Sequence, residues 1–420
     1  MHLKSLRLPV FALVILIASN PGWGQSVANA PDKEVHWVGT WGTSPQLTEP
    51  KNLPPPPGLA SNTLRQVVQV SIGGKKMRVR FSNVFGDGPV TIAAAHVALA
   101  AGGSAIKPVS DRALAFQSKP SAVIPAGESV LSDPFDFDLA PLSRLAVTIH
   151  FDGLPANVTG HPGSRSSSYL QAGDAVSAAD LPAAARTEHW YILNGVDVEA
   201  DNSSAAIVVL GDSITDGRGS GTDKNDRWPD NLARRLQADR STAGLTVLNE
   251  GIGGNCVLHG GLGPTALARF DRDVLAQNGA RWLIVLEGVN DIGGSRGTNS
   301  PVAQDLIAAF EKIIDQARAH HIRVYGATIL PFGGSFYDRP GHEAARQAVN
   351  DWIRTGGRFD AVIDFDAAMR DPLNPSQLLS AADSSDHLHP NETGYKMMAD
   401  AIDLKLFGKP VTLPAVEPIR

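Results

Sequence analysis

The sequence predicts a two-part fold, in which an antiparallel β-sandwich or jelly roll precedes an α/β unit with a parallel sheet. In residues 35–151, short runs alternate apolar and polar side chains between glycine- and proline-rich turns, which is typical of half-buried strands. After about residue 205, wholly apolar runs alternate with amphipathic segments, which is typical of a parallel sheet covered by helices on both faces. A polar stretch at residues 199–204 separates the two patterns.

Each half contains segments that match its pattern. The strand candidates of the first half are residues 64–72, 76–81, 90–98, 129–137 and 145–151, with a tight hairpin turn expected at Gly73-Gly74. Those of the second half are residues 205–210, 245–248, 282–286, 323–329 and 361–363. Apolar side chains at helical spacing predict helices over residues 301–320 and from Trp228 onward.

Length and charge narrow the class of protein. A chain of 420 residues is long enough for two domains with separate cores, and we place a β-sandwich domain at residues 31–200 and an α/β domain at residues 205–408. The net charge is −6 and no cluster of lysine and arginine stands out, which argues against a nucleic acid or an anionic membrane as partner. The oligomeric state stays open.

The N-terminal residues predict export. Lys4 and Arg7 precede an apolar run at residues 8–18, and small residues then allow cleavage after Gly24 or as late as Ala30. We therefore expect a signal peptide at residues 1–24 and a secreted or periplasmic protein, with an uncleaved membrane anchor as the alternative. Later stretches are too short or too polar to span a membrane, so we expect no span in the mature chain.

Three unusual loops follow predicted strands of the second half. The first strand runs into Gly211-Asp212-Ser213, the second into Gly253-Gly254-Asn255, and the third into Glu287-Gly288-Val289-Asn290-Asp291. Ligands of open α/β sheets bind at the carboxyl ends of the strands. We expect these loops to form a site together with Asp386-His387-Leu388-His389, which opens the last predicted helix.

These residues supply the groups that acyl transfer needs. Ser213 would be the nucleophile, His389 the base that takes its proton, and Asp386 the carboxylate that orients the base. Their three-residue spacing puts Asp386 and His389 on one face of a helical turn. The oxyanion would accept hydrogen bonds from the N–H groups of Ser213 and Gly254 and from the side-chain amide of Asn290.

The four segments, in this order, resemble the sequence blocks of the SGNH (GDSL-like) hydrolase superfamily over about residues 205–407. The resemblance implies a flavodoxin-like three-layer α/β/α fold, ester hydrolysis through an acyl-serine intermediate, and neither a metal nor another cofactor. The first half resembles the β-sandwich that precedes the catalytic domain in an exported two-domain subset. Together these inferences predict an exported serine ester hydrolase.

The substrate is predicted by analogy. We expect acetyl or other short acyl groups on carbohydrate, because an exported enzyme with an added β-sandwich meets polymers that cannot enter the cell. Lipids and small aryl esters are the alternatives. The candidates for substrate binding are Asp212, Asn255, Glu287 and Arg165. Glu287 either is a solvated loop carboxylate or lines the pocket, and Arg165 lies in a polar segment, residues 161–169, that either reaches the crevice or is an exposed connection.

Other classes fit the sequence less well. An α/β-hydrolase would need a G-x-S-x-G elbow around the serine, which is missing. A metal-dependent deacetylase could use Asp212, Asp216, His387 and His389, but Ser213 and Asn290 would then have no role. The remaining alternative is a non-catalytic carbohydrate-binding surface protein. Cys256, the single cysteine, is expected to be a small buried residue rather than a nucleophile.

Overall fold

The computed structural model describes residues 35–297 and 301–408, and from His36 on these residues form one compact unit. The predicted signal peptide lies outside the described residues. Within the part of the chain that is described, no helix is long and apolar enough to cross a membrane.

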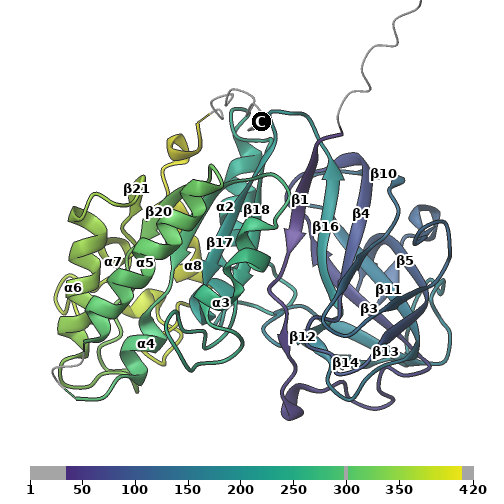
Figure 1. The fold of residues 1–420 in the computed structure, drawn as a ribbon, viewed down its shortest axis with the longest axis horizontal. Coiled ribbons are helices and arrows are strands. Elements are labelled where there is room, and N and C mark those ends of the chain that lie inside the picture. Colours follow the sequence, from purple (N-terminus) through teal and green to yellow (C-terminus); the bar gives the residue numbers. More distant parts are fainter. Residues whose placement is uncertain (1–34, 298–300, 409–420) are drawn as a thin grey trace, which may run out of the picture. The chain divides into compact units, whose positions relative to one another are not determined.

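The first half is a sandwich of antiparallel sheets, as predicted (Figure 1). One sheet has the order β1-β16-β4-β10, and the facing sheet has the order β14-β13-β3-β11-β5-β6. The strands of the first sheet are β1 (Trp37–Gly42), β16 (Leu193–Glu199), β4 (Gly74–Ser82) and β10 (Phe135–Leu139). Those of the second are β14 (Ala185–Thr187), β13 (Ser168–Ala172), β3 (Asn62–Gln69), β11 (Arg144–Gly153), β5 (Val90–Gly102) and β6 (Ala105–Ile106). The hairpin expected at Gly73-Gly74 is wrong, because the chain crosses there from β3 in one sheet to β4 in the other.

Strand β4 shows why the alternating sequence forms a sandwich. Met77, Val79 and Phe81 are fully buried, and the residues between them are more exposed. Alternate side chains of a strand point to opposite faces, so one face enters the core. The segment predicted as one strand at residues 129–137 is two strands, β9 (Ser129–Leu131) and β10, which both pair with β4. Pro134 separates them, because proline has no N–H to donate to a ladder.

The second half is an open parallel sheet with helices, as predicted. Its order is β18-β17-β19-β20-β21, the flavodoxin-like order, and every pairing along it is parallel. The strands are β17 (Ala205–Gly211), β18 (Leu245–Gly251), β19 (Ala280–Leu286), β20 (Arg323–Ala327) and β21 (Ala361–Ile363). Every residue of β17 is buried, as expected for a central strand covered on both faces.

Helices pack on the two faces of this sheet. In Figure 1, α5 (Val302–Ala319) lies in front of the strands and α8 (Glu392–Asp400) behind them. Helix α2 (Trp228–Ala238) packs with α8, and α5 packs with α6 (His342–Thr355). The buried residues of α5 recur at helical spacing along its inner side.

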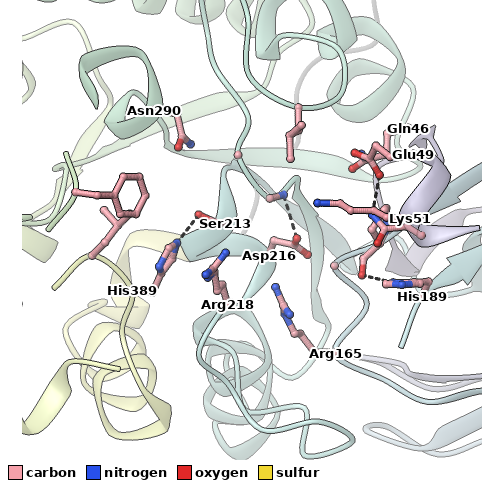
Figure 2. A pocket seen from close by; sticks show the side chains of 18 of the residues that line it. Gln46, Glu49, Lys51, Arg165, His189, Ser213, Asp216, Arg218, Asn290 and His389 are labelled. Carbon is pink, nitrogen blue, oxygen red and sulfur yellow. Dashed lines mark hydrogen bonds between the residues drawn. The ribbon is translucent and has the colours of Figure 1, made fainter. Parts of the chain in front are cut away.

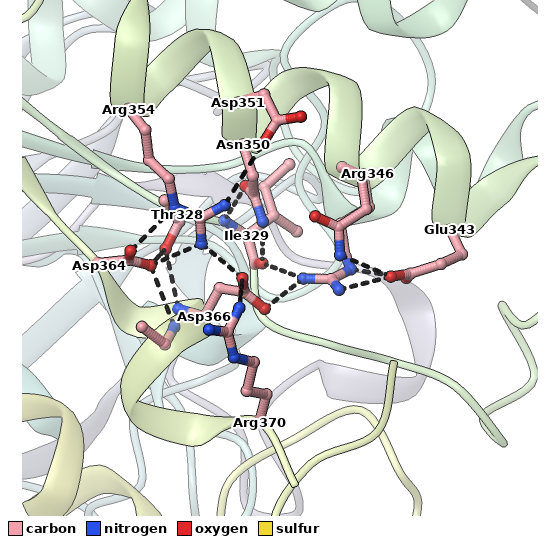
Figure 3. A network of polar contacts seen from close by, with 12 residues as sticks. Thr328, Ile329, Glu343, Arg346, Asn350, Asp351, Arg354, Asp364, Asp366 and Arg370 are labelled. Atoms are coloured by element: carbon pink, nitrogen blue, oxygen red, sulfur yellow. Dashed lines mark hydrogen bonds and ion pairs between the residues drawn. The ribbon is translucent and has the colours of Figure 1, made fainter. Parts of the chain in front are cut away.

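A network of arginines and carboxylates fastens α6 to the loop after β20 and to α7 (Phe365–Met369) (Figure 3). The fully buried Arg346 donates to the carboxylate of Asp366 at 2.6 Å and to the carbonyl of Ile329 at 3.1 Å. Arg354 bonds the second oxygen of Asp366. A buried carboxylate is stable only when it is paired and hydrogen-bonded in this way.

Strand β1 joins the two halves. The N–H of Gly39 donates to Asn278 at 2.9 Å, and the hydroxyl of Thr246 donates to the carbonyl of Gly39 at 2.6 Å. A Cβ at position 39 would lie 2.9 Å from Cδ1 of Leu248, so a larger residue there would require the Leu248 side chain to move. One large apolar cluster runs through both halves, where the sequence suggested separate cores. The boundary drawn at residues 200–205 falls in the turn between β16 and β17.

Candidate active site

The short helix α1 (Ser213–Asp216) starts directly after β17 and presents Ser213 at the carboxyl edge of the sheet (Figure 2). Asp212 caps this helix, since its side chain accepts from the N–H of Ile214 at 2.9 Å. The Ser213 hydroxyl lies 2.8 Å from Nε2 of His389. The Nδ1 atom of His389 lies 2.6 Å from the carboxylate of Asp386.

The carboxylate of Asp386 is held in the ionised form. Burial opposes ionisation, but hydrogen bonds from the backbone and side chain of His389 and from the N–H of Leu388 lower the pKa of Asp386 to about 2. An ionised Asp386 fixes the Nδ1–H tautomer of His389 and leaves Nε2 free to accept the serine proton. Burial lowers the pKa of His389, Asp386 opposes this shift, and the nearby guanidinium groups of Arg218 and Arg165 add to it.

The expected helical turn from Asp386 to His389 is wrong. Helix α8 begins only at Glu392, after the cap residue Asn391, and His387 has a positive φ of 61°. The two side chains meet because Asp386 accepts the N–H groups of residues 388 and 389, which closes a tight turn. His387, the neighbouring histidine, is 56% exposed and contacts Asp383 instead of the serine.

Three hydrogen-bond donors border the pocket beside Ser213. Gly254, with φ of 74°, follows β18, and neither its N–H nor that of Ser213 has a hydrogen-bond partner in the described structure. The amide of Asn290 donates one hydrogen to the carbonyl of Asn255 at 2.8 Å, and its oxygen accepts from Tyr337 at 3.0 Å. The second amide hydrogen of Asn290 therefore remains available.

The four residues proposed for substrate binding separate into two groups. Arg165 lines the pocket, with the segment around it, as Figure 2 shows. Asp212 and Asn255 do not, because both are buried and bonded to the backbone: Asp212 caps α1, and Asn255 donates to Leu262 and Pro264. Glu287 is neither a solvated carboxylate nor a pocket residue, since it is 1% exposed and pairs with Arg269.

The buried carboxyl groups near the site have raised pKa values. Burial, aided by neighbouring carboxylates, raises the pKa of Asp212 to about 7 and that of Glu287 well above its usual range. Burial likewise raises the pKa of Cys256 to about 12, so this thiol is inert at neutral pH. The described residues contain no group of three or more histidine, cysteine, aspartate or glutamate side chains arranged to hold a metal ion.

A histidine from the polar segment 161–169 reaches the site, so this segment is not an exposed connection. His161 ends strand β12 (Thr159–His161), and its two ring nitrogens lie 2.9 Å from the carbonyl of Ser44 and 2.9 Å from Oδ1 of Asp216. The other oxygen of Asp216 accepts from the N–H of Gly253 at 3.0 Å. A Cβ on Gly163 would lie 1.8 Å from Asp216, so only glycine permits this approach.

The pocket itself is an open cavity of about 400 Å³ with contributions from both halves of the chain. The first half supplies Gln46, Glu49, Lys51, Asn52, Pro162, Gly163, Arg165 and His189. The second half supplies Ser213, Asp216, Arg218, Gly253, Gly254, Leu262, Asn290, Phe336, Tyr337, Leu388 and His389. The sandwich thus forms one wall of the cavity that contains the serine.

Comparison with solved structures finds similar folds over about half of this chain. An acetylxylan esterase from Geobacillus stearothermophilus is 21% identical with a TM-score of 0.37, over 48% of this chain and 94% of that one. A GDSL-like lipase from Bacteroides thetaiotaomicron is 20% identical with a TM-score of 0.34, over 47% of this chain and 84% of that one. No curated protein matches.

The model of the GDSL-like lipase/acylhydrolase family matches residues 209–397. This range starts in β17, contains the serine and the two loops that follow β18 and β19, and ends in α8. Residues 209–397 are therefore a GDSL-like lipase/acylhydrolase domain, and the protein is a carboxylic ester hydrolase.

Proposed function

We propose that Ser213, His389 and Asp386 hydrolyse the ester through an acyl-serine intermediate. The observation that carries this proposal is the continuous chain of hydrogen bonds from the serine hydroxyl through His389 to Asp386, at 2.8 and 2.6 Å. His389 takes the serine proton as Oγ attacks the carbonyl carbon, and then gives that proton to the departing alcohol. A water molecule activated by His389 releases the acid from the serine in the second half of the reaction.

The oxyanion of each tetrahedral intermediate would accept from the N–H groups of Ser213 and Gly254 and from the amide of Asn290. The first two donors have no other partner in the described structure, and Asn290 is fixed by Asn255 and Tyr337. Donors that are already oriented stabilise developing negative charge without reorganisation, and each contributes about 3 kcal/mol.

We propose that the acyl group is short and that the alcohol is a carbohydrate. Polar side chains line the wall contributed by the sandwich, which suits hydroxyl groups better than a lipid tail. Phe336 is 63% exposed at the pocket and packs against Tyr337 with ring centroids 4.3 Å apart, so it offers a face for a sugar ring. The charged and apolar N-terminal segment supports export to a place where polymers are met.

A panel of esters tests this proposal. Acetylated xylan, acetylated pectin, and short- and long-chain p-nitrophenyl esters are offered to the wild type, to Ser213→Ala and to the exposed control Ser241→Ala. We expect acetate release from polysaccharide, lost by several orders of magnitude in Ser213→Ala at unchanged stability and kept in the control.

Two outcomes of this panel would count against the account. Retention of about a tenth of wild-type activity in Ser213→Ala would reject the serine mechanism. Hydrolysis limited to long acyl chains would keep the mechanism and assign the enzyme to lipids, and hydrolysis limited to p-nitrophenyl esters would indicate an arylesterase.

The pH dependence should follow His389. This base must be neutral to act, so kcat/KM rises as pH rises through the pKa of His389, which burial holds below its usual 6.5. The value of kcat/KM should be half-maximal below pH 6.5 and should reach a plateau at higher pH. Asp386 raises the pKa of His389, so Asp386→Asn should shift the acid limb to lower pH and lower the plateau. An unshifted acid limb in this variant would be inconsistent with the assigned roles.

The contact between His161 and Asp216 should support the oxyanion loop. Without His161, the carboxylate of Asp216 loses one hydrogen-bond partner and can move away from the N–H of Gly253. We expect the neighbouring N–H of Gly254 to lose its alignment as a result. We expect His161→Gln to lower kcat about tenfold or more with little change in KM, as part of the loss seen when one oxyanion donor is removed.

The matched control for this variant is His36→Gln. His36 also joins the two halves, through a 3.0 Å bond to the carbonyl of Ser204, but Ser204 does not line the pocket, whereas Asp216, the partner of His161, does. Both variants are compared for kcat and for unfolding in urea. Equal loss of stability with wild-type kcat in both would show that His161 has only a structural role.

A further inference from the structure

Three cationic side chains project into the cavity that holds Ser213. They are Lys51, Arg165 and Arg218 (Figure 2). None of the three side chains has a hydrogen bond or an ion pair among the described residues. Most other arginines of the described chain bond to carboxylates or carbonyls, as Arg269 and Arg346 do, so a cluster of free cations beside a nucleophile is unusual.

The carboxylates of the same cavity have other partners. Glu49 accepts from the side chains of Gln46 and Asn52, at 3.0 and 2.8 Å. Asp216 contacts His161 and the N–H of Gly253. Neither carboxylate forms an ion pair with Lys51, Arg165 or Arg218, so the three cations of the cavity outnumber its two carboxylates and have no salt-bridge partner among the described residues.

The fold holds the backbones of both arginines beside the site. Arg165 adopts φ of 50°, and its carbonyl accepts from Asp223, whose carboxylate in turn accepts from Ser167. The Nε of Arg165 is buried and lacks a partner. Arg218 follows Gly217, which ends α1 with φ of 99°, and its backbone bonds to Ser213 and Tyr395. The left-handed backbone of Arg165 is sterically unfavourable for a residue other than glycine, so the fold holds this arginine in place at an energetic cost.

The two guanidinium groups also act on the base. His389 becomes positively charged when it takes the serine proton, and Arg218 and Arg165 disfavour that charged form. A negative charge brought by the substrate would offset this repulsion. Arginine pairs well with carboxylates, because its planar fork can donate two parallel hydrogen bonds.

We propose that the preferred substrate is an ester whose alcohol portion carries a carboxylate, such as an acylated uronic acid unit of an acidic polysaccharide. Arg165 and Arg218 bind the carboxylate, and Lys51 adds attraction from the sandwich wall. This inference rests on the proposed serine esterase function, which it deepens by naming the charge of the substrate.

The test compares acetylated galacturonic acid with its methyl ester, in which the carboxylate is replaced by an uncharged group, and the release of acetate is measured. We expect kcat/KM to be at least about tenfold higher for the carboxylate form at low salt, and the advantage to shrink in 0.5 M NaCl as the charges are screened. Arg165→Gln and Arg218→Gln should each lower the ratio of the two kcat/KM values about tenfold. Arg240→Gln, an exposed arginine outside the cavity, should leave the ratio unchanged.

The outcomes separate this inference from the esterase proposal. Equal kcat/KM for the two substrates in an enzyme that needs Ser213 would overturn the inference and leave the esterase mechanism intact. A preference for the carboxylate that survives in both arginine variants would overturn the assignment of the binding residues. Hydrolysis of both substrates by Ser213→Ala would instead reject the esterase mechanism.

Discussion

The active site depends on one buried arginine that is not part of the triad. Arg269 is 1% exposed, and its guanidinium donates to the carbonyls of Gly211 and Glu250, which end β17 and β18. It also bonds Asn255 in the glycine loop and Glu287 after β19. The three loops that carry Ser213, Gly254 and Asn290 are thus fastened to a single group.

The same arginine reaches the sandwich. Its Nη1 donates to the hydroxyl of Ser44 at 2.8 Å, and Ser44 in turn bonds Glu250 and accepts from His161 through its carbonyl. Burial raises the pKa of Glu250 to about 8, so this carboxyl group can stay neutral while Asp273 pairs with Arg269. One polar network therefore connects the wall formed by the sandwich with the edge of the parallel sheet. The first half of the chain is part of the site.

The sequence was sufficient where chemistry depends on short spacing or on the order of elements. Ser213, Asp386 and His389 could be proposed because loops after parallel strands meet at one edge, and because a three-residue spacing keeps an acid beside its base. The fold class followed from the change of period near residue 200. The details of the acid-base turn did not follow, because φ above zero at His387 has no clear sequence signal.

The rest of the site depends on tertiary contacts between distant residues. His161 and Asp216 are 55 positions apart, and Ser44 and Arg269 are 225 apart, so no local pattern reports either contact. Glu287 and Asn255 were assigned to the pocket from their loops, but Arg269 draws both into the interior. A residue in a loop can either line a pocket or pack beneath the residues that line it. The sequence alone does not distinguish these two positions.

The central claim is that Ser213 forms the covalent intermediate. Labelling with a fluorophosphonate, which reacts with activated serines, followed by mass spectrometry of the peptides tests it directly. The account predicts one adduct per chain, on the peptide that contains Ser213, with ester hydrolysis lost in proportion to labelling and no adduct in His389→Ala. An enzyme that hydrolyses esters at full rate while Ser213 is fully labelled, or that is labelled elsewhere as it loses activity, would contradict it.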